Sequence, residues 1–140
     1  MDADSELERI LQRKAKELQS SRQTDLDKAE DEGYGPMKLS DQNFDKYVRR
    51  KSLAIVDFWA EWCGPCRDML PVFERLAKRY GDRVLFGRVN VDEYGNLASR
   101  YEVYGIPTFI IFHNGVPADR IVGAVGEQGL ERLLVGHLKG

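Results

Sequence analysis

The sequence has only two cysteines, only two histidines and no long apolar segment among its 140 residues. The two cysteines, Cys63 and Cys66, are too few to form the disulfide framework of a small secreted fold. No apolar run approaches the roughly 20 residues that cross a membrane, and the first residues lack the apolar core of a secretory signal. We therefore expect a cytoplasmic protein that does not bind a membrane.

An excess of positive charge is also missing. The formal net charge is −2 at pH 7, so the chain is not suited to neutralising many phosphates, and we expect no nucleic-acid partner. The charge is uneven, because residues 1–36 hold ten acidic and six basic side chains, whereas residues 37–140 hold thirteen acidic and fifteen basic ones. An acidic leading segment thus precedes a nearly neutral body.

The leading segment, residues 1–36, is predicted to be a charged helical extension and linker. Apolar side chains recur at helical spacing within residues 5–19, which predicts a helix there. Residues 20–36 are polar and end in glycine and proline, which is typical of a linker. The narrow apolar stripe of the helix could dock on the body, on a second copy of the chain or on a reductase, or the segment could remain a solvated tail. We expect a monomer, with a dimer through this helix as the alternative.

The body, residues 37–140, alternates between strand and helix patterns. Residues 53–59 form a nearly continuous apolar run, typical of a central strand covered on both faces. A short helix is expected from Phe44, with Ser40 as its N-cap, and Asn114-Gly115 predicts a hairpin. The further predicted strands are 84–91, 108–112 and 120–125, and the further predicted helices are 63–80, 96–101 and 128–138. This order indicates an α/β fold with a parallel portion and an antiparallel edge.

The two cysteines lie in the sequence Trp62-Cys63-Gly64-Pro65-Cys66, where the central strand gives way to a helix. A helix N-terminus carries unpaired N–H groups and partial positive charge, both of which stabilise a thiolate. Cys63 is therefore predicted to be the exposed attacking thiol. Cys66, one turn into the helix, is predicted to be the buried thiol that resolves the mixed disulfide.

Three other interpretations of the pair compete with redox chemistry. A structural disulfide across so small a loop would add little entropic stability. Half of a zinc site would need further ligands, and only His113 and His137 remain, both far away in the sequence. Two unreactive thiols are the third alternative. Redox chemistry is favoured because a Cys-x-x-Cys motif near a strand–helix–strand pattern is typical of it. We expect no metal, and we expect both histidines to be surface residues without nearby ligand partners.

The stretch from Val56 to Cys66 closely resembles the active-site signature of the thioredoxin family. Other matching segments follow in the family's order and extend the resemblance over about residues 38–139: Pro71, Val89-Asn90-Val91-Asp92, Tyr104-Gly105-Ile106-Pro107-Thr108, Asn114-Gly115 and Gly123-Ala124. The resemblance implies a thioredoxin fold, with a central mixed sheet of four to five strands flanked by helices on both faces. Here an N-terminal helix would be added to it.

The resemblance further implies that the chain reduces protein disulfides. It would do so with no cofactor beyond a redox-active Cys63–Cys66 disulfide, and a thioredoxin reductase would restore the dithiol. The Gly64-Pro65 pair between the cysteines is similar to the pair found in reductants of this family. It differs from the pair found in the family's oxidants. That reductase would be either an NADPH-dependent flavin enzyme or a ferredoxin-linked one.

Residues outside the pair also gain expected roles from the resemblance. Asp57 lies inside an apolar strand, where burial would raise the pKa of its carboxyl group; the family match places it beneath Cys66 as a proton relay, and a solvent-facing carboxylate is the alternative. The match also implies a cis Ile106–Pro107 bond that faces the cysteines. Gly123 would leave room for an extended substrate segment, or would mark a strand bulge. The expected substrate-binding residues are Trp62, Gly64, Pro65, Ile106, Pro107 and Gly123.

Two supporting residues, Trp59 and Arg88, complete the expected site. Trp59 should pack beside the cysteines, either as a core residue or in a direct role. Arg88 departs from the family, in which lysine is common at this position. Arginine keeps its charge and presents a rigid fork of donors, so an Arg88 that reaches Asp57 would lower the pKa of that carboxyl group more persistently than lysine would.

The alternative function is that of a binding module, in which the same fold acts as a partner subunit through its N-terminal helix. A third and weaker interpretation is metal or cluster bridging across a dimer through the paired thiols.

Overall fold

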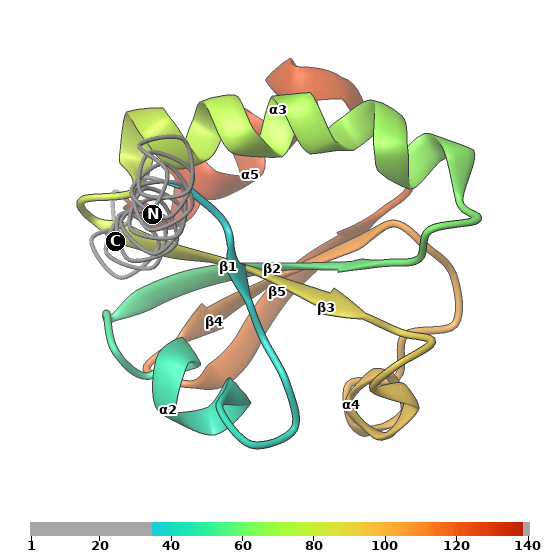
Figure 1. Cartoon of the computed structure of the whole chain (residues 1–140). Coiled ribbons are helices and arrows are strands. Elements are labelled where there is room, and N and C mark those ends of the chain that lie inside the picture. The colour runs from blue at the N-terminus through green and yellow to red at the C-terminus, as the bar shows by residue number, and fades with distance from the viewer. Residues whose placement is uncertain (1–34, 139–140) are drawn as a thin grey trace, which may run out of the picture.

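A five-stranded mixed sheet forms the centre of the molecule in the computed structural model, which describes residues 35–138 (Figure 1). The strand order is β1-β3-β2-β4-β5. The parallel strands are β1 (Met37–Lys38), β2 (Leu53–Trp59) and β3 (Val84–Asn90), and the antiparallel ones are β4 (Thr108–His113) and β5 (Val116–Val122). The predicted central mixed sheet of four to five strands is thus confirmed, whereas the helix predicted at residues 5–19 lies outside the described residues.

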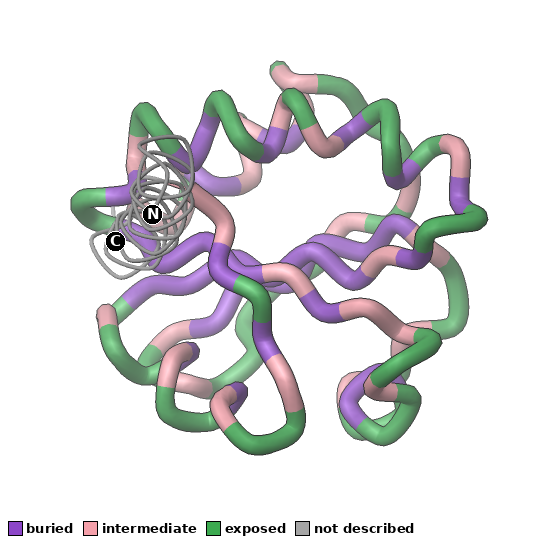
Figure 2. The backbone as a smooth tube through the Cα atoms, in the orientation of Figure 1, coloured by how far each residue is buried: buried purple, intermediate pink, exposed green. Residues whose placement is uncertain are grey.

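Helices cover both faces of the sheet. In Figure 1, α3 (Gly64–Tyr80) and α5 (Gly126–Leu138) lie on one side of it, and α2 (Phe44–Val48) and α4 (Gly95–Arg100) lie on the other. Figure 2 shows that the strands at the centre of the sheet are buried while the outward positions of the helices are exposed. The two faces therefore have separate cores.

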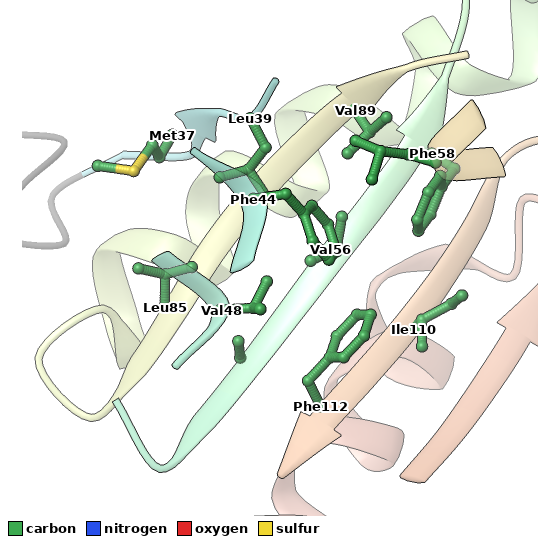
Figure 3. Packing of buried hydrophobic residues seen from close by; sticks show 12 residues of the cluster. Met37, Leu39, Phe44, Val48, Val56, Phe58, Leu85, Val89, Ile110 and Phe112 are labelled. Atoms are coloured by element: carbon green, nitrogen blue, oxygen red, sulfur yellow. The ribbon is translucent and has the colours of Figure 1, made fainter. Parts of the chain in front are cut away.

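Side-chain alternation along β2 divides its residues between these two cores. Ala54, Val56 and Phe58 join the cluster on the α2 and α4 side, which Figure 3 shows from close by. Leu53 and Ile55 join the cluster beneath α3 and α5. The same alternation places Asp57 on the α3 side, within an otherwise apolar layer.

The second strand of the final hairpin begins earlier than predicted. Asn114 and Gly115 form the expected turn, with φ of 50° and 83°, the positive values that a two-residue hairpin turn requires. β5 then begins at Val116, paired with His113, and ends at Val122. The prediction of 120–125 was wrong because β5 is an edge strand with mostly exposed side chains, so it lacks the alternation that marks a half-buried strand.

The N-terminal end of α2 also differs from the prediction. The helix has Asn43, not Ser40, at its N-cap. Ser40 lies in the preceding turn, where its Oγ accepts a hydrogen bond from the Asn43 N–H at 3.3 Å and its own N–H donates to Asn43 Oδ1 at 2.7 Å. This reciprocal pair shapes the turn before the helix. β1, which pairs with β3 over only two residues, was not predicted because so short a strand has no periodicity.

Gly87 in β3 provides a test of how tightly the α2-side core is packed. A Cβ atom at this position would collide with the side chain of Leu39, which is buried. Gly87→Ala is therefore expected to lower the free energy of unfolding by about 1–3 kcal/mol, the usual cost of overpacking. Gly136→Ala is the control, because Gly136 is exposed in α5 with open space around it, and alanine there should stabilise the helix by up to about 1 kcal/mol. Urea denaturation of both variants measures the difference, and equal stabilities would contradict it.

Candidate active site

The Cys63–Cys66 pair lies at the turn between β2 and α3. Cys63 is the N-cap residue of α3, with extended backbone (φ −88°, ψ 105°), and Pro65 occupies one of the first two helical positions, where its fixed φ suits the helix. The backbone N–H of Cys66 donates to Cys63 Sγ at 3.2 Å. The two sulfurs are joined in a disulfide. The N-terminal end of α3 therefore presents a backbone N–H group to the Cys63 sulfur.

Both cysteines are buried in this disulfide-bonded form. The exposed fraction is 4% for Cys63 and 0% for Cys66, so the expectation that Cys63 is exposed is wrong for this state. The pair packs in a small cluster with Ala60 and Ile106, and Cys63 Sγ lies 3.8 Å from the carbonyl oxygen of Ile106. The two cysteines thus differ more in position than in exposure: Cys63 is the N-cap of α3, and Cys66 lies inside its first turn.

The loop that carries Ile106 and Pro107 faces the cysteine pair. The Ile106–Pro107 peptide bond is cis, as the resemblance implied, and Ile106 contacts the cysteine cluster. The N–H of Gly123 donates to the Pro107 carbonyl oxygen at 2.8 Å, which joins this loop to the chain that leaves β5. The two loops therefore form a continuous edge beside the disulfide.

Gly123 has open space around it. Its φ of +104° favours glycine, and apart from its two chain neighbours no described residue has an atom within 4 Å of the place a Cβ would take. The register shift of the β4–β5 ladder lies between Ile111 and Phe112, so the strand-bulge alternative does not account for this glycine.

Exposed apolar side chains are neighbours in sequence of the cysteine turn, of the Ile106–Pro107 loop and of Gly123. Trp62 is 68% exposed, and its indole Nε1–H donates to Asp92 Oδ2 at 2.9 Å. Gly64 and Pro65 follow it at the start of α3. Tyr104, two positions before Ile106, is 90% exposed. Val122 and Val125, on either side of Gly123, are also exposed.

Asp57 is completely buried on the α3 side of the sheet. The parallel register of β2 and β3 pairs it with Arg88, whose Nε–H donates to Asp57 Oδ2 at 3.1 Å. Oδ1 has no hydrogen-bond partner among the described residues. Burial raises the pKa of the Asp57 carboxyl group to about 6, against the opposing charge and hydrogen bond of Arg88. The solvent-facing alternative is therefore excluded, and Arg88 does reach Asp57.

The two histidines are partly buried and contact each other, although they are far apart in the sequence. His113 Nε2 lies 2.9 Å from His137 Nδ1, and His137 Nε2 lies 2.9 Å from Asp119 Oδ2. The contact joins the end of β4 to the last turn of α5, which are 24 residues apart, so local sequence could not reveal it. Within residues 35–138 no group of three or more His, Cys, Asp or Glu side chains is arranged to hold a metal ion. No helix in this range has both the length and the apolar character needed to cross a membrane.

A Cys-x-x-Cys disulfide at a helix N-cap, with a buried carboxylate on the same side of a mixed sheet, defines a thiol–disulfide oxidoreductase. Comparison with known proteins gives the family. The family model for thioredoxin matches residues 35–135. The thioredoxins of Staphylococcus haemolyticus and Staphylococcus aureus are 40% and 41% identical to this chain over 102 residues, which is 73% of this chain and 97% of each relative.

Solved structures agree with the sequence matches. A mutant thioredoxin from Halobacterium salinarum has a TM-score of 0.68 and 32% identity, over 72% of this chain and 88% of that one. Plasmodium falciparum thioredoxin has a TM-score of 0.67 and 34% identity, over 71% and 97% of the two chains. The chain belongs to the thioredoxin family and is a protein-disulfide reductase. Membership implies proteins with disulfides as substrates and a reductase as the kind of partner that supplies electrons.

Proposed function

We propose that the chain reduces protein disulfides with Cys63 as the attacking thiol and Cys66 as the resolving thiol, and that a thioredoxin reductase restores the pair. The position of Cys63 supports this assignment. It is the N-cap of α3, and its sulfur receives the Cys66 N–H at 3.2 Å. A thiolate at Cys63 would keep this donor and the favourable end of the helix dipole, whereas Cys66 lies inside the helix.

The exchange consists of two displacements. The Cys63 thiolate attacks one sulfur of the substrate disulfide, an S–S bond forms between them, and the other substrate sulfur leaves as a thiolate that takes up a proton. Cys66 then loses its proton and attacks Cys63. This step forms the Cys63–Cys66 disulfide and releases the second substrate thiolate. Two electrons thus pass from the dithiol to the substrate, and the reductase returns two electrons to the pair.

Asp57 is proposed to take the proton that Cys66 loses. Alternation along β2 places the carboxyl group on the face that α3 covers, and its Oδ1 has no hydrogen-bond partner among residues 35–138. Because burial raises its pKa to about 6, Asp57 is a stronger base than an ordinary aspartate near neutral pH. Such tuning suits a general base.

The substrate is proposed to bind as an extended segment across the edge formed by Ile106, Pro107 and Gly123. Backbone pairing along such an edge is a recurring mode of peptide recognition. The open space at Gly123 supports this role, since a side chain there would occupy the path of the segment. Trp62, Gly64 and Pro65 border the same area from the start of α3.

Reduction of insulin disulfides tests the proposal. The full chain is expected to accelerate insulin reduction well above the rate with dithiothreitol alone, and also with NADPH and a thioredoxin reductase as the electron source. No acceleration in either assay would overturn it.

We also propose that residues 37–140 form the catalytic domain, acting as a monomer in the reducing cytoplasm. A chain that begins at Met37 should then match the full chain in these assays, whereas a large loss would favour a partner-binding role for the extension.

The variant Trp62→Ala tests substrate binding without a large change in stability. Because Trp62 is 68% exposed, Trp62→Ala is expected to change the free energy of unfolding by less than about 0.5 kcal/mol. The same change should raise KM for insulin several-fold, because an aromatic contact at an interface is lost. Val116→Ala is the control, since Val116 is also exposed but lies at the opposite end of β5 from Gly123. Equal KM values for the two variants would count against a substrate-binding role for Trp62.

A further inference from the structure

Asp57 and Trp59 lie near the carboxyl end of β2, and Arg88 of the neighbouring strand β3 contacts both of them. The Arg88 guanidinium lies over the Trp59 ring, 4.1 Å from its centroid, while Nε of the same group donates to Asp57 Oδ2 at 3.1 Å. Trp59 is half-buried, and the Arg88 side chain is 15% exposed. A guanidinium stacked on indole in this way gains cation–π attraction that increases as water is excluded.

The Arg88 guanidinium, which is stacked on the Trp59 ring, also borders a pocket with acidic side chains. Arg88 lines a pocket of about 340 Å³ that also includes the exposed residues Glu61 and Glu93. Both carboxylates would attract a guanidinium that turned outward, where it would also regain water. Lys38 of β1 is the other cation at this pocket. The structure thus has an inner position for Arg88, on Asp57, and an outer region that would compete for it.

Few groups act on Asp57 apart from Arg88. From β3, Arg88 supplies the charge that opposes the effect of burial. From β4, the residue in register with Asp57 is Phe109, which is apolar. From α3, the titratable residue buried on this side is Cys66, which is in the disulfide here. The position of Arg88 therefore decides how much cationic charge the carboxyl group experiences.

We propose that Trp59 is a positioning residue that keeps Arg88 on Asp57 Oδ2, and thereby sets how readily Asp57 exchanges a proton. Its bearing on the resolving step rests on the proposed function, in which Asp57 takes the proton of Cys66. Without the ring, Arg88 turns towards Glu61 and Glu93. Burial of Asp57 is then less opposed, and the carboxyl group holds its proton to higher pH.

The test is the pH titration of the Asp57 carboxyl carbon by NMR in the full, disulfide-bonded chain. Trp59→Leu is expected to raise the midpoint by about one pH unit, a typical effect of losing a nearby opposite charge. Arg88→Met is expected to raise it by at least as much. Water admitted near Asp57 by the smaller side chain would lower the midpoint instead of raising it. To separate the two effects, Trp59→Leu is also made in the Arg88→Met chain. In that chain Trp59→Leu should no longer raise the midpoint.

Two further variants keep the test decisive. Trp59→Phe retains a ring and should give a smaller shift than Trp59→Leu, even if the leucine variant folds poorly. Tyr94→Leu is the control, because Tyr94 lines the same pocket but is not stacked on Arg88; its midpoint should match that of the unmodified chain.

An unchanged midpoint in both Trp59 variants, or the same upward shift with and without Arg88, would overturn the proposal. The titration needs no substrate and no turnover. A failure of the proposed reductase function would therefore leave this result interpretable, and a failure here would leave the exchange chemistry intact.

Discussion

Cys66→Ser is expected to accumulate a covalent adduct with disulfide substrates, joined through Cys63. Cys63 can still attack, because its cap position at α3 does not depend on the Cys66 sulfur. No second thiol is present to resolve the mixed disulfide, since the sequence has only these two cysteines. Multiple turnover should fall to the rate of the added dithiol alone. Non-reducing gels and intact mass after incubation with a disulfide-containing protein measure the adduct.

Cys63→Ser is the matched variant for this experiment. It retains a thiol at Cys66, but that thiol lies inside the first turn with no exposed surface in the disulfide-bonded form. It should therefore form little or no adduct and show no turnover. Adduct formation at equal rates by both variants would mean that the two cysteines are equivalent nucleophiles, against the assignment made from the helix cap.

Asp57→Asn is expected to stabilise the protein by about 3 kcal/mol at pH 7 and above. Burial raises the pKa of Asp57 from 3.8 to about 6. Between these values the folded chain binds the proton more tightly than the unfolded chain, so stability falls as pH rises through this range and stays low above pH 6. The difference of about two pH units corresponds to about 3 kcal/mol at about 1.4 kcal/mol per unit. Asparagine has nearly the same shape and carries no charge at any of these pH values.

The gain should depend on pH in a defined way. Urea denaturation of the two proteins should show their largest difference near pH 8, and the stabilising contribution should disappear by about pH 4. Arg88 loses its ionic partner in the variant, but its partly exposed side chain can turn towards the pocket that holds Glu61 and Glu93. Asp68→Asn, which changes an exposed carboxylate of α3, is the control and should lack this pH-dependent gain. A stability difference for Asp57→Asn that is the same at pH 4 and pH 8 would contradict the buried, proton-binding state of Asp57.

The cysteine turn and the buried aspartate were both accessible from sequence. The apolar run of Leu53–Trp59 interrupted by Asp57 predicts a central strand with a buried carboxylate, and the Cys-x-x-Cys motif that follows predicts a helix start. These features are local, since they depend on strand periodicity and on cap chemistry. Such signals are strong when neighbouring residues all favour the same structure.

The features that sequence did not reveal depend on contacts between distant residues. Burial of Cys63 depends on Ile106, which is 43 positions away, and the contact of His113 with His137 joins different elements. The sequence showed that arginine replaces the family's usual lysine at position 88. The approach of Arg88 to Asp57 could be expected because the two residues lie on neighbouring strands. Its stacking on Trp59 could not be expected, because it depends on the conformation of a long side chain in the folded molecule.

The most direct test of the central claim is the reduction potential of the Cys63–Cys66 pair, measured in full-length protein equilibrated with dithiol–disulfide buffers. Members of this family that act as reductants lie near roughly −270 mV, and strong oxidants of the same chemistry lie near about −120 mV. A protein-disulfide reductase re-reduced by a thioredoxin reductase should have a potential close to the first value. A potential close to the second would mean that the pair donates its disulfide to other proteins, and would contradict the account.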